Sequence, residues 1–208
     1  MKYHIEKNTV QETLVIPLYG RKMCLELYPN LYRDETALRL MEQIDYDFSL
    51  LSQKSKSLMQ QFGFLEAAMH QNDLAWEVRD YLREHPNAAV VNLGCGLDDT
   101  GRSCDNGSCR IYNLDFPGVI AVRLMLKTWI KTAEIQDVGA YFAVSDAKKE
   151  LSAWSPRLRV SSRGYMLGYQ SLNDPSVPGF YRFLARVGDG MMRMQIVRLE
   201  FAEGETAL

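Results

Sequence analysis

The spacing of apolar residues predicts helices in the first part of the chain. Behind Asp34, which suits a helix N-cap, apolar residues recur at helical spacing and predict a helix of about 13 residues. These apolar positions are Ala37, Leu40, Met41, Ile44 and Phe48. A second helix is expected over residues 53–69, with an interruption near Gly63. The third carries Leu74, Val78 and Leu82 and ends before Pro86, because the residue preceding a proline is pushed out of the helical region.

Residues 1–33 have no clear period and are expected to be irregular. Pro17, Gly20 and Pro29 punctuate this stretch. An ordered loop over a cofactor and a plain N-terminal arm covering the edge of the core are equally good interpretations.

From residue 88 onward the pattern changes to short, β-branched apolar runs. Residues 88–93 and 111–115 are predicted strands. The polar stretch between them, residues 99–110, leaves room only for a short helix starting at Leu97 or Asp98. Residues 118–135 then carry one apolar face, which predicts an amphipathic helix.

The last third of the chain predicts a strand, a helix and a strand. Residues 140–144 are either a short strand or a loop, and residues 165–169 alternate as a strand does. A turn at residues 173–175 leads into a short helix at 179–187 and a long strand at 191–201. An ending of this kind, without a buried parallel-type run, predicts the antiparallel closing strand of a mixed sheet.

Composition narrows the class of protein. With 208 residues, 47% of them hydrophobic, the chain can bury a core and is expected to form a single domain. The net charge of −2 comes without a basic stripe, which argues against nucleic acid as a partner. Its apolar runs are too short to span a membrane, and residues 1–6 lack the apolar core of a signal peptide. A cytoplasmic protein is therefore expected.

Cysteine usage agrees with that compartment. In a reducing environment Cys24, Cys95, Cys104 and Cys109 are expected to be thiols, and the pair flanking the polar turn is expected to be dispensable. The cysteines show neither paired spacing nor a nearby histidine, so no metal site is predicted.

The most informative stretch joins the two central strands. Leu93-Gly94-Cys95-Gly96 ends the first strand in two glycines, which let the backbone turn sharply and approach a ligand. Asp115 follows Gly96 by nineteen residues and ends the second strand, where a carboxylate can hold the hydroxyls of a ribose. The third glycine of the dinucleotide fingerprint is missing. The alternative is an ordinary strand-to-helix turn with a helix-capping aspartate.

Four stretches together resemble the leucine carboxyl methyltransferase and polyketide O-methyltransferase family, the tetracenomycin-type enzymes. They are residues 16–21 (Ile-Pro-Leu-Tyr-Gly-Arg), 32–37 (Tyr-Arg-Asp-Glu-Thr-Ala), 85–98 and 112–123. The resemblance implies an α/β fold, the Rossmann-like class I methyltransferase sheet with helices on both faces. It also implies S-adenosylmethionine as cofactor and methylation of a carboxylate or hydroxyl of a small molecule.

The resemblance further implies site residues. Those implied to bind the cofactor are Leu93, Gly94, Cys95, Gly96, Asp115, Phe116 and His70, and those implied to bind the methyl acceptor are Tyr19 and Arg21. Two positions depart from the family: His70 stands where relatives carry an arginine for the cofactor carboxylate, and Asp99 replaces a threonine. His4, His70 and His85 form no visible base and nucleophile set, which favours a carboxylate acceptor.

The family pattern is interrupted between residues 123 and 124. Residues 1–85 correspond to a helical cap region and residues 86–208 to the Rossmann-like core, from which roughly 70 to 80 residues with three central strands are missing. Either the segment is deleted or it is left out of the sequence; the second is favoured, because a sheet stripped of its central strands exposes unpaired edges. The rival function is a non-catalytic remnant that binds S-adenosylmethionine or a partner surface. Homo-oligomerisation stays open.

Overall fold

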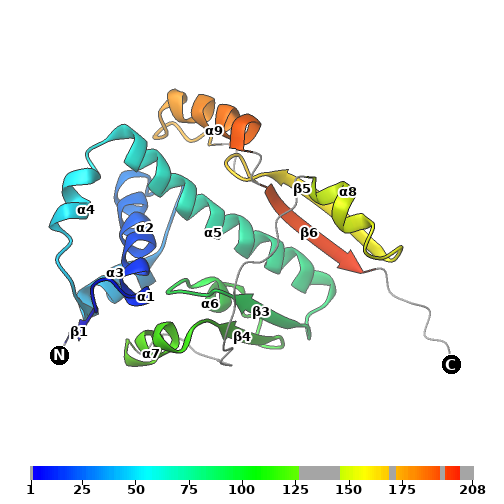
Figure 1. The fold of residues 1–208 in the computed structure, drawn as a ribbon, viewed down its shortest axis with the longest axis horizontal. Helices are drawn as coiled ribbons and strands as arrows, with labels where there is room; N and C mark the ends of the chain where they lie inside the picture. Colours follow the sequence, from blue (N-terminus) through cyan, green and yellow to red (C-terminus); the bar gives the residue numbers. More distant parts are fainter. Residues whose placement is uncertain (1, 127–145, 169–171, 193–194, 202–208) are drawn as a thin grey trace. The chain divides into compact units, whose positions relative to one another are not determined.

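The computed structural model describes residues 2–126, 146–168, 172–192 and 195–201. The chain divides into two compact units, Met1–Val138 and Gly139–Leu208. Within the described residues the structure is mixed α/β and holds three small sheets of two strands each (Figure 1). This agrees with the predicted α/β class, while the larger Rossmann-like sheet stays a prediction.

The N-terminal stretch is helical, so the prediction of an irregular segment was wrong. After β1 (Tyr3–His4), α1 covers Val10–Thr13 and α2 covers Val15–Leu27. Pro17 lies in the first turn of α2, where its missing N–H removes no helical hydrogen bond. Gly20 lies where α2 meets α5: a Cβ added there would approach the Phe64 ring to 2.9 Å. Both residues that look like helix breakers therefore fit their helical positions.

The helix predicted behind Asp34 is present but shorter than expected. α3 covers Glu35–Gln43, and the Asp34 side chain accepts a hydrogen bond of 2.9 Å from the Ala37 N–H, as an N-cap does. Ile44 has already left the helix and begins β2 (Ile44–Asp45), which pairs in parallel with β1.

A single long helix replaces the helix predicted over residues 53–69, with its interruption near Gly63, and the helix predicted to end before Pro86. After α4 (Ser49–Lys54), α5 runs without a break over Leu58–Glu84. Gly63 is exposed, and a Cβ there would meet nothing within 4 Å. The predicted helix end is confirmed, because His85 is the C-cap.

The two central strands are confirmed as a parallel pair. β3 (Ala89–Leu93) and β4 (Arg110–Leu114) align from Ala89 opposite Arg110 to Leu93 opposite Leu114. Figure 1 shows them side by side, with α6 (Thr100–Cys104) in the connection and α7 (Pro117–Met125) after β4. The connecting helix thus begins slightly later than predicted. The predicted helix end beyond residue 126 and the candidate strand at 140–144 lie outside the described residues.

Two apolar clusters lie among the described residues of this unit. The larger joins α2, α3, β2, α7 and the segments next to them through Ile5, Leu14, Val15, Leu18, Ala37, Leu40, Ile44, Leu97, Val119, Val122 and Leu126. The smaller packs α5 and α6 against the strands through Ala75, Leu82, Cys104, Cys109 and Ile111. All four cysteines are free and buried. The structure agrees with the thiol prediction. Cys104 and Cys109 are core residues, and that they are dispensable stays a prediction.

The second unit contains a helix-flanked antiparallel pair. Its elements are α8 (Ala147–Ser152), β5 (Leu158–Gly164), α9 (Gly179–Met192) and β6 (Gln195–Phe201). β5 and β6 pair antiparallel, with Leu158 opposite Phe201. The turn before α9 is confirmed by the hydrogen bond from the Val177 N–H to the Asp174 carbonyl, and α9 runs further than predicted.

The strand predicted at residues 165–169 is wrong in its position. Residues 165–168 form a turn after β5, and Tyr169 lies outside the described residues. The Asp189 carboxylate accepts hydrogen bonds from the N–H groups of Met166 (2.7 Å) and Leu167 (3.1 Å). Because these backbone donors are bound by a side chain of α9, they are not available to a neighbouring strand.

Two further findings concern the described residues only. No helix among them is both long and apolar enough to cross a membrane. Within the same ranges, no three His, Cys, Asp or Glu side chains gather as a metal site requires.

Candidate functional site

The turn after β3 is held by its own backbone and by the end of β4. Gly94 and Gly96 have positive φ angles of 65° and 47°, which glycine adopts without strain. The N–H groups of Gly94 and Cys95 both donate to the Leu114 carbonyl, at 2.8 and 3.2 Å, and the Asp98 N–H donates to the Cys95 carbonyl at 3.0 Å. These N–H groups are therefore not available to cradle a phosphate.

Two buried arginines bind the carbonyl groups of the same turn. Arg123 of α7 donates to the carbonyls of Gly96 (2.7 Å) and Asp98 (3.2 Å). Arg21 of α2 donates to the Leu97 carbonyl at 2.7 Å. Charged donors on backbone carbonyls make strong hydrogen bonds, so both helices fix the turn.

Asp115 connects the end of β4 to the glycine turn. One carboxylate oxygen accepts the Gly96 N–H at 2.7 Å, and the other accepts the Phe116 N–H at 2.8 Å at the start of α7. An ionised carboxylate offers about four acceptor positions, so two stay open for hydroxyl donors. The structure thus shows Asp115 in the predicted place, with a local structural role as well.

Asp98 is a second carboxylate beside the turn. The Asn92 amide donates to both of its oxygens, at 3.0 and 3.1 Å, and the Arg123 guanidinium lies 4.0 Å away. Burial raises the pKa of Asp98, and the Asn92 hydrogen bond and the Arg123 charge offset this only in part.

A cavity of about 420 Å³ opens beside these groups, and we call it the glycine-turn cavity. It is lined by Val10, Thr13, Leu14, Pro17, Leu18, Arg21, Ala67, His70, Gln71, Gly94, Cys95, Gly96, Leu97, Asp98, Asp115, Phe116 and Val119. This volume falls in the range of small-molecule sites, and apolar walls with a few polar groups are typical of them.

The cavity brings most of the predicted site residues together. Gly94, Cys95, Gly96, Asp115, Phe116, His70 and Arg21 all line it. Leu93 and Tyr19 are not among the lining residues. Leu93 is exposed at the end of β3, and the buried Tyr19 ring packs between Phe48 and Phe64.

The titratable groups of the cavity favour binding over nucleophilic chemistry. Burial raises the pKa of the Cys95 thiol to about 11, so this cysteine stays protonated at neutral pH. Burial lowers the pKa of His70, so its imidazole is neutral there.

Arg21 also forms a buried ion pair that faces away from the turn. Its Nε donates to the Asp34 carboxylate at 2.6 Å, and the Tyr32 hydroxyl donates to the same oxygen at 2.8 Å. Burial acts to raise the pKa of Asp34, but the Arg21 charge and the hydrogen bonds outweigh it and hold that pKa below its usual value. Asp34 is therefore a charged partner of Arg21 as well as the N-cap of α3.

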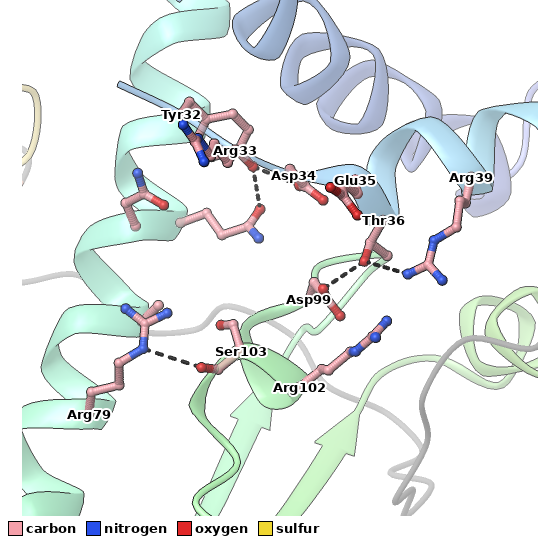
Figure 2. A pocket seen from close by; sticks show the side chains of 13 residues that line it. Tyr32, Arg33, Asp34, Glu35, Thr36, Arg39, Arg79, Asp99, Arg102 and Ser103 are labelled. Atoms are coloured by element: carbon pink, nitrogen blue, oxygen red, sulfur yellow. Dashed lines mark hydrogen bonds between the residues drawn. The ribbon is translucent and has the colours of Figure 1, made fainter. Parts of the chain in front are cut away.

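A second cavity of about 340 Å³ has Asp34 of this ion pair in its lining (Figure 2). We call it the arginine cavity, after Arg33, Arg39, Arg79 and Arg102. Asp34 lines the arginine cavity, Arg21 lines the glycine-turn cavity, and Gln71 lines both.

The amino-acid sequence is also similar to that of a known protein. The chain is 32% identical over 118 residues to the tetracenomycin polyketide synthesis O-methyltransferase TcmP of Streptomyces glaucescens. The aligned residues make up 56% of this chain and 42% of that relative. The chain therefore spans less than half of the curated relative it matches.

The similarity to a methyltransferase confirms the predicted resemblance in its coarser form. The link to leucine carboxyl methyltransferases stays a prediction, as does the position of the missing segment. No protein-family model matches the chain. No solved structure matches it.

The sequence did not indicate three of the groups that shape the cavity. The sequence pattern places Arg123 in a helix, Asp98 in a turn and Asn92 in a strand, and it indicates no site role for them. Asn92 carried a weak signal, because it is a polar residue within an apolar strand. Arg123 lies 25 residues from the Asp98 carbonyl that it binds, and no local pattern reports such a contact.

Proposed function

We propose that the glycine-turn cavity binds the nucleoside part of S-adenosylmethionine and that the protein is a methyltransferase or derives from one. The observation that carries this proposal is the turn itself. Its backbone donors at Gly94, Cys95, Gly96 and Asp98 are occupied within the protein, whereas Asp115 keeps acceptor positions beside it. Such a site suits a ribose without phosphate better than it suits a dinucleotide, whose pyrophosphate needs free N–H groups.

The residues divide into three roles in this proposal. Asp115 accepts the ribose hydroxyls, and Gly94 and Gly96 let the backbone come close to the ligand. Leu14, Leu18 and Val119 supply apolar wall. His70 and Arg21 are the groups that face the cofactor carboxylate, Arg21 with a permanent charge and His70 with a neutral ring. The resemblance implies that Arg21 binds the methyl acceptor. Its place in the cavity lining is compatible with binding the acceptor or the cofactor carboxylate.

When bound, S-adenosylmethionine supplies a methyl group already activated on a sulfonium. The protein then contributes mainly by positioning the two reactants and excluding water. Beside the turn, burial keeps the Cys95 thiol protonated, so this group is not a ready nucleophile or base. A carboxylate acceptor needs no base, so we propose a small-molecule carboxylate ahead of a hydroxyl.

The second candidate is a protein that binds the cofactor without transferring its methyl group. The observation that favours it is the lining of the glycine-turn cavity, which offers groups that can bind a ligand while its Cys95 thiol stays protonated. Single-turnover transfer to a panel of small carboxylic acids separates the two candidates, since both bind S-adenosylmethionine and only the enzyme consumes it.

The binding step is tested by calorimetry with S-adenosylhomocysteine and NADH on the wild type and on Asp115→Asn. We expect the wild type to bind S-adenosylhomocysteine in preference to NADH. Replacing the carboxylate removes a charge-assisted acceptor and weakens S-adenosylhomocysteine binding by at least about tenfold.

The control for this test is Asp105→Asn, an aspartate in the connection after α6 that lines neither cavity. Its affinity should equal that of the wild type. Because Asp115 also binds two backbone N–H groups, the Asp115→Asn protein is first shown to be folded by circular dichroism. Tight NADH binding without a response to S-adenosylhomocysteine would overturn the proposal.

A further inference from the structure

The arginine cavity carries four guanidinium groups from three helices and the loop before one of them. Arg33 precedes α3, Arg39 lies on it, Arg79 lies on α5, and Arg102 lies on α6. Figure 2 shows these side chains around one hollow, in which Arg39 and Arg102 extend on the same side of Asp99. Segments far apart in sequence thus bring like charges to one place.

The acidic residues of this cavity do not cancel that charge. Asp34 is already paired with the buried Arg21, so it cannot be counted against the cavity arginines. Asp99 accepts a hydrogen bond of 2.7 Å from the Thr36 hydroxyl, and Glu35 is exposed in the first turn of α3. Four guanidinium groups and the two remaining carboxylates, those of Asp99 and Glu35, therefore line the cavity. The cavity keeps an excess of positive charge.

None of the four guanidinium groups is bound to a carboxylate in the described part of the chain. Arg39 donates to the Thr36 hydroxyl at 3.2 Å, and Arg79 donates to the Ser103 carbonyl at 3.3 Å. The guanidinium groups of Arg33 and Arg102 have no hydrogen bond or ion pair with any described residue. This contrasts with Arg21, whose pairing with Asp34 is nearly free of solvent.

Neutral donors complete the lining. The side chains of Gln71 and Asn72 border the same hollow, and each carries an amide N–H group, whereas the Ser103 hydroxyl already donates to the Thr100 carbonyl at 3.1 Å. Guanidinium groups bind phosphate oxygens through paired N–H groups, and hydroxyl and amide donors commonly supplement them. The volume of about 340 Å³ is that of a small-molecule site.

We propose that the arginine cavity is a second ligand site, which binds a small molecule through a phosphoryl group. A phosphoryl group carries up to two negative charges and three acceptor oxygens, which matches several convergent guanidinium groups better than a single carboxylate does. Free phosphate, pyrophosphate and the phosphate of a larger metabolite share this chemistry. The site is distinct from the glycine-turn cavity in its lining, because Gln71 is the one residue that the two linings share.

The experiment titrates the full chain with inorganic phosphate and with pyrophosphate, by calorimetry at constant ionic strength. We expect pyrophosphate to bind more tightly than phosphate, because it reaches more of the guanidinium groups. Arg39→Gln and Arg102→Gln should each weaken pyrophosphate binding by about tenfold, the size expected for losing a charge-assisted hydrogen bond. Sodium chloride at the same ionic strength is the blank, since it only screens.

The matched control is Arg159→Gln, an exposed arginine on β5 that lies in the other unit. It should bind pyrophosphate as the wild type does, within twofold. Equal weakening in Arg159→Gln would mean that pyrophosphate responds to net charge alone, and no binding at millimolar concentration would mean that the cavity is solvated surface. Either result overturns the proposal.

A separate titration keeps this proposal apart from the proposed function. Arg39 and Arg102 do not line the glycine-turn cavity, so both variants should bind S-adenosylhomocysteine as the wild type does. If S-adenosylhomocysteine fails to bind the wild type while pyrophosphate binds, the proposed function is wrong and the phosphoryl site stands. If S-adenosylhomocysteine binds the wild type while pyrophosphate does not, the phosphoryl site is wrong and the proposed function stands.

Discussion

The glycine-turn cavity and the arginine cavity share the helix α5 but differ in charge. Asp98 and Asp115 supply carboxylates to the first, beside Arg21, whereas four arginines line the second. One buried ion pair contributes to both linings, with Arg21 in the glycine-turn cavity and Asp34 in the arginine cavity. The difference shows that a charge already paired inside the protein does not neutralise the other charges of its cavity. Because Asp34 is paired with Arg21, it does not neutralise the arginines next to it.

The largest effect is expected from removing that ion pair. Arg21→Met leaves the Asp34 carboxylate buried without its main partner and frees the Leu97 carbonyl, so the free energy of unfolding should fall by about 3 to 5 kcal/mol. Chemical denaturation measures the change. Lys22→Met is the control, since Lys22 pairs with Glu26 at the surface and its loss should cost less than about 0.5 kcal/mol.

Equal stability of the two variants would contradict this account of the Arg21–Asp34 ion pair. The remaining interactions of Asp34, with Tyr32 and the N–H of Ala37, would then be sufficient to keep its charge buried.

The next effect concerns the contact between α2 and α5, which both contribute lining to the cavities. Gly20→Ala places a methyl group against the Phe64 ring, so we expect a loss of about 1 to 3 kcal/mol in the free energy of unfolding. Gly63→Ala, on the same α5 but facing open space, should instead gain about 0.5 to 1 kcal/mol from helix propensity.

The pair of glycine variants is measured by thermal unfolding under identical conditions. Opposite signs support a tight α2 to α5 contact at Gly20. A gain in stability in both would mean that Phe64 moves aside and that glycine is not required there.

The smallest effect sharpens the contrast in charge. His70→Arg adds a permanent positive charge to the glycine-turn cavity, where relatives of the family are expected to carry one. A charged hydrogen bond to the cofactor carboxylate is stronger than one from a neutral ring, so affinity for S-adenosylhomocysteine should rise roughly fivefold. Calorimetry at pH 8, where the wild-type imidazole is neutral, measures it.

His70→Gln is the matched control, because it keeps a neutral donor and should bind S-adenosylhomocysteine within about twofold of the wild type. Weaker binding by His70→Arg would place the cofactor carboxylate away from His70 and leave Arg21 as the group that binds it.

Local features of the sequence were sufficient for several elements. Asp34 as an N-cap, the end of α5 at His85 and the two strands around the glycine turn were all predicted correctly. Each depends on neighbours within a few residues: a side chain that accepts its own helix's N–H groups, a proline that excludes helical backbone, and a run of β-branched residues.

The errors fall where a distant residue decides the local structure. Gly20 predicts a break in the helix, but α2 continues through it and the Phe64 ring of α5 packs against it. The pattern of residues 165–168 predicts a strand, but the N–H groups of Met166 and Leu167 donate to Asp189. In both places tertiary contacts overrode a local preference worth only about 1 kcal/mol.

The candidate site divides in the same way. The sequence alone determined the glycine turn and its partner Asp115. Positive φ angles favour glycine, which is visible at positions 94 and 96, and the carboxylate is visible as an aspartate directly after an apolar strand. Only the tertiary structure decided what the arginines do. An arginine has the same character in sequence whether it is solvated, bound to a backbone carbonyl or paired with a carboxylate, and Arg21 meets the Leu97 carbonyl 76 residues away. Its role follows from the packing of α2, which no neighbouring residue specifies.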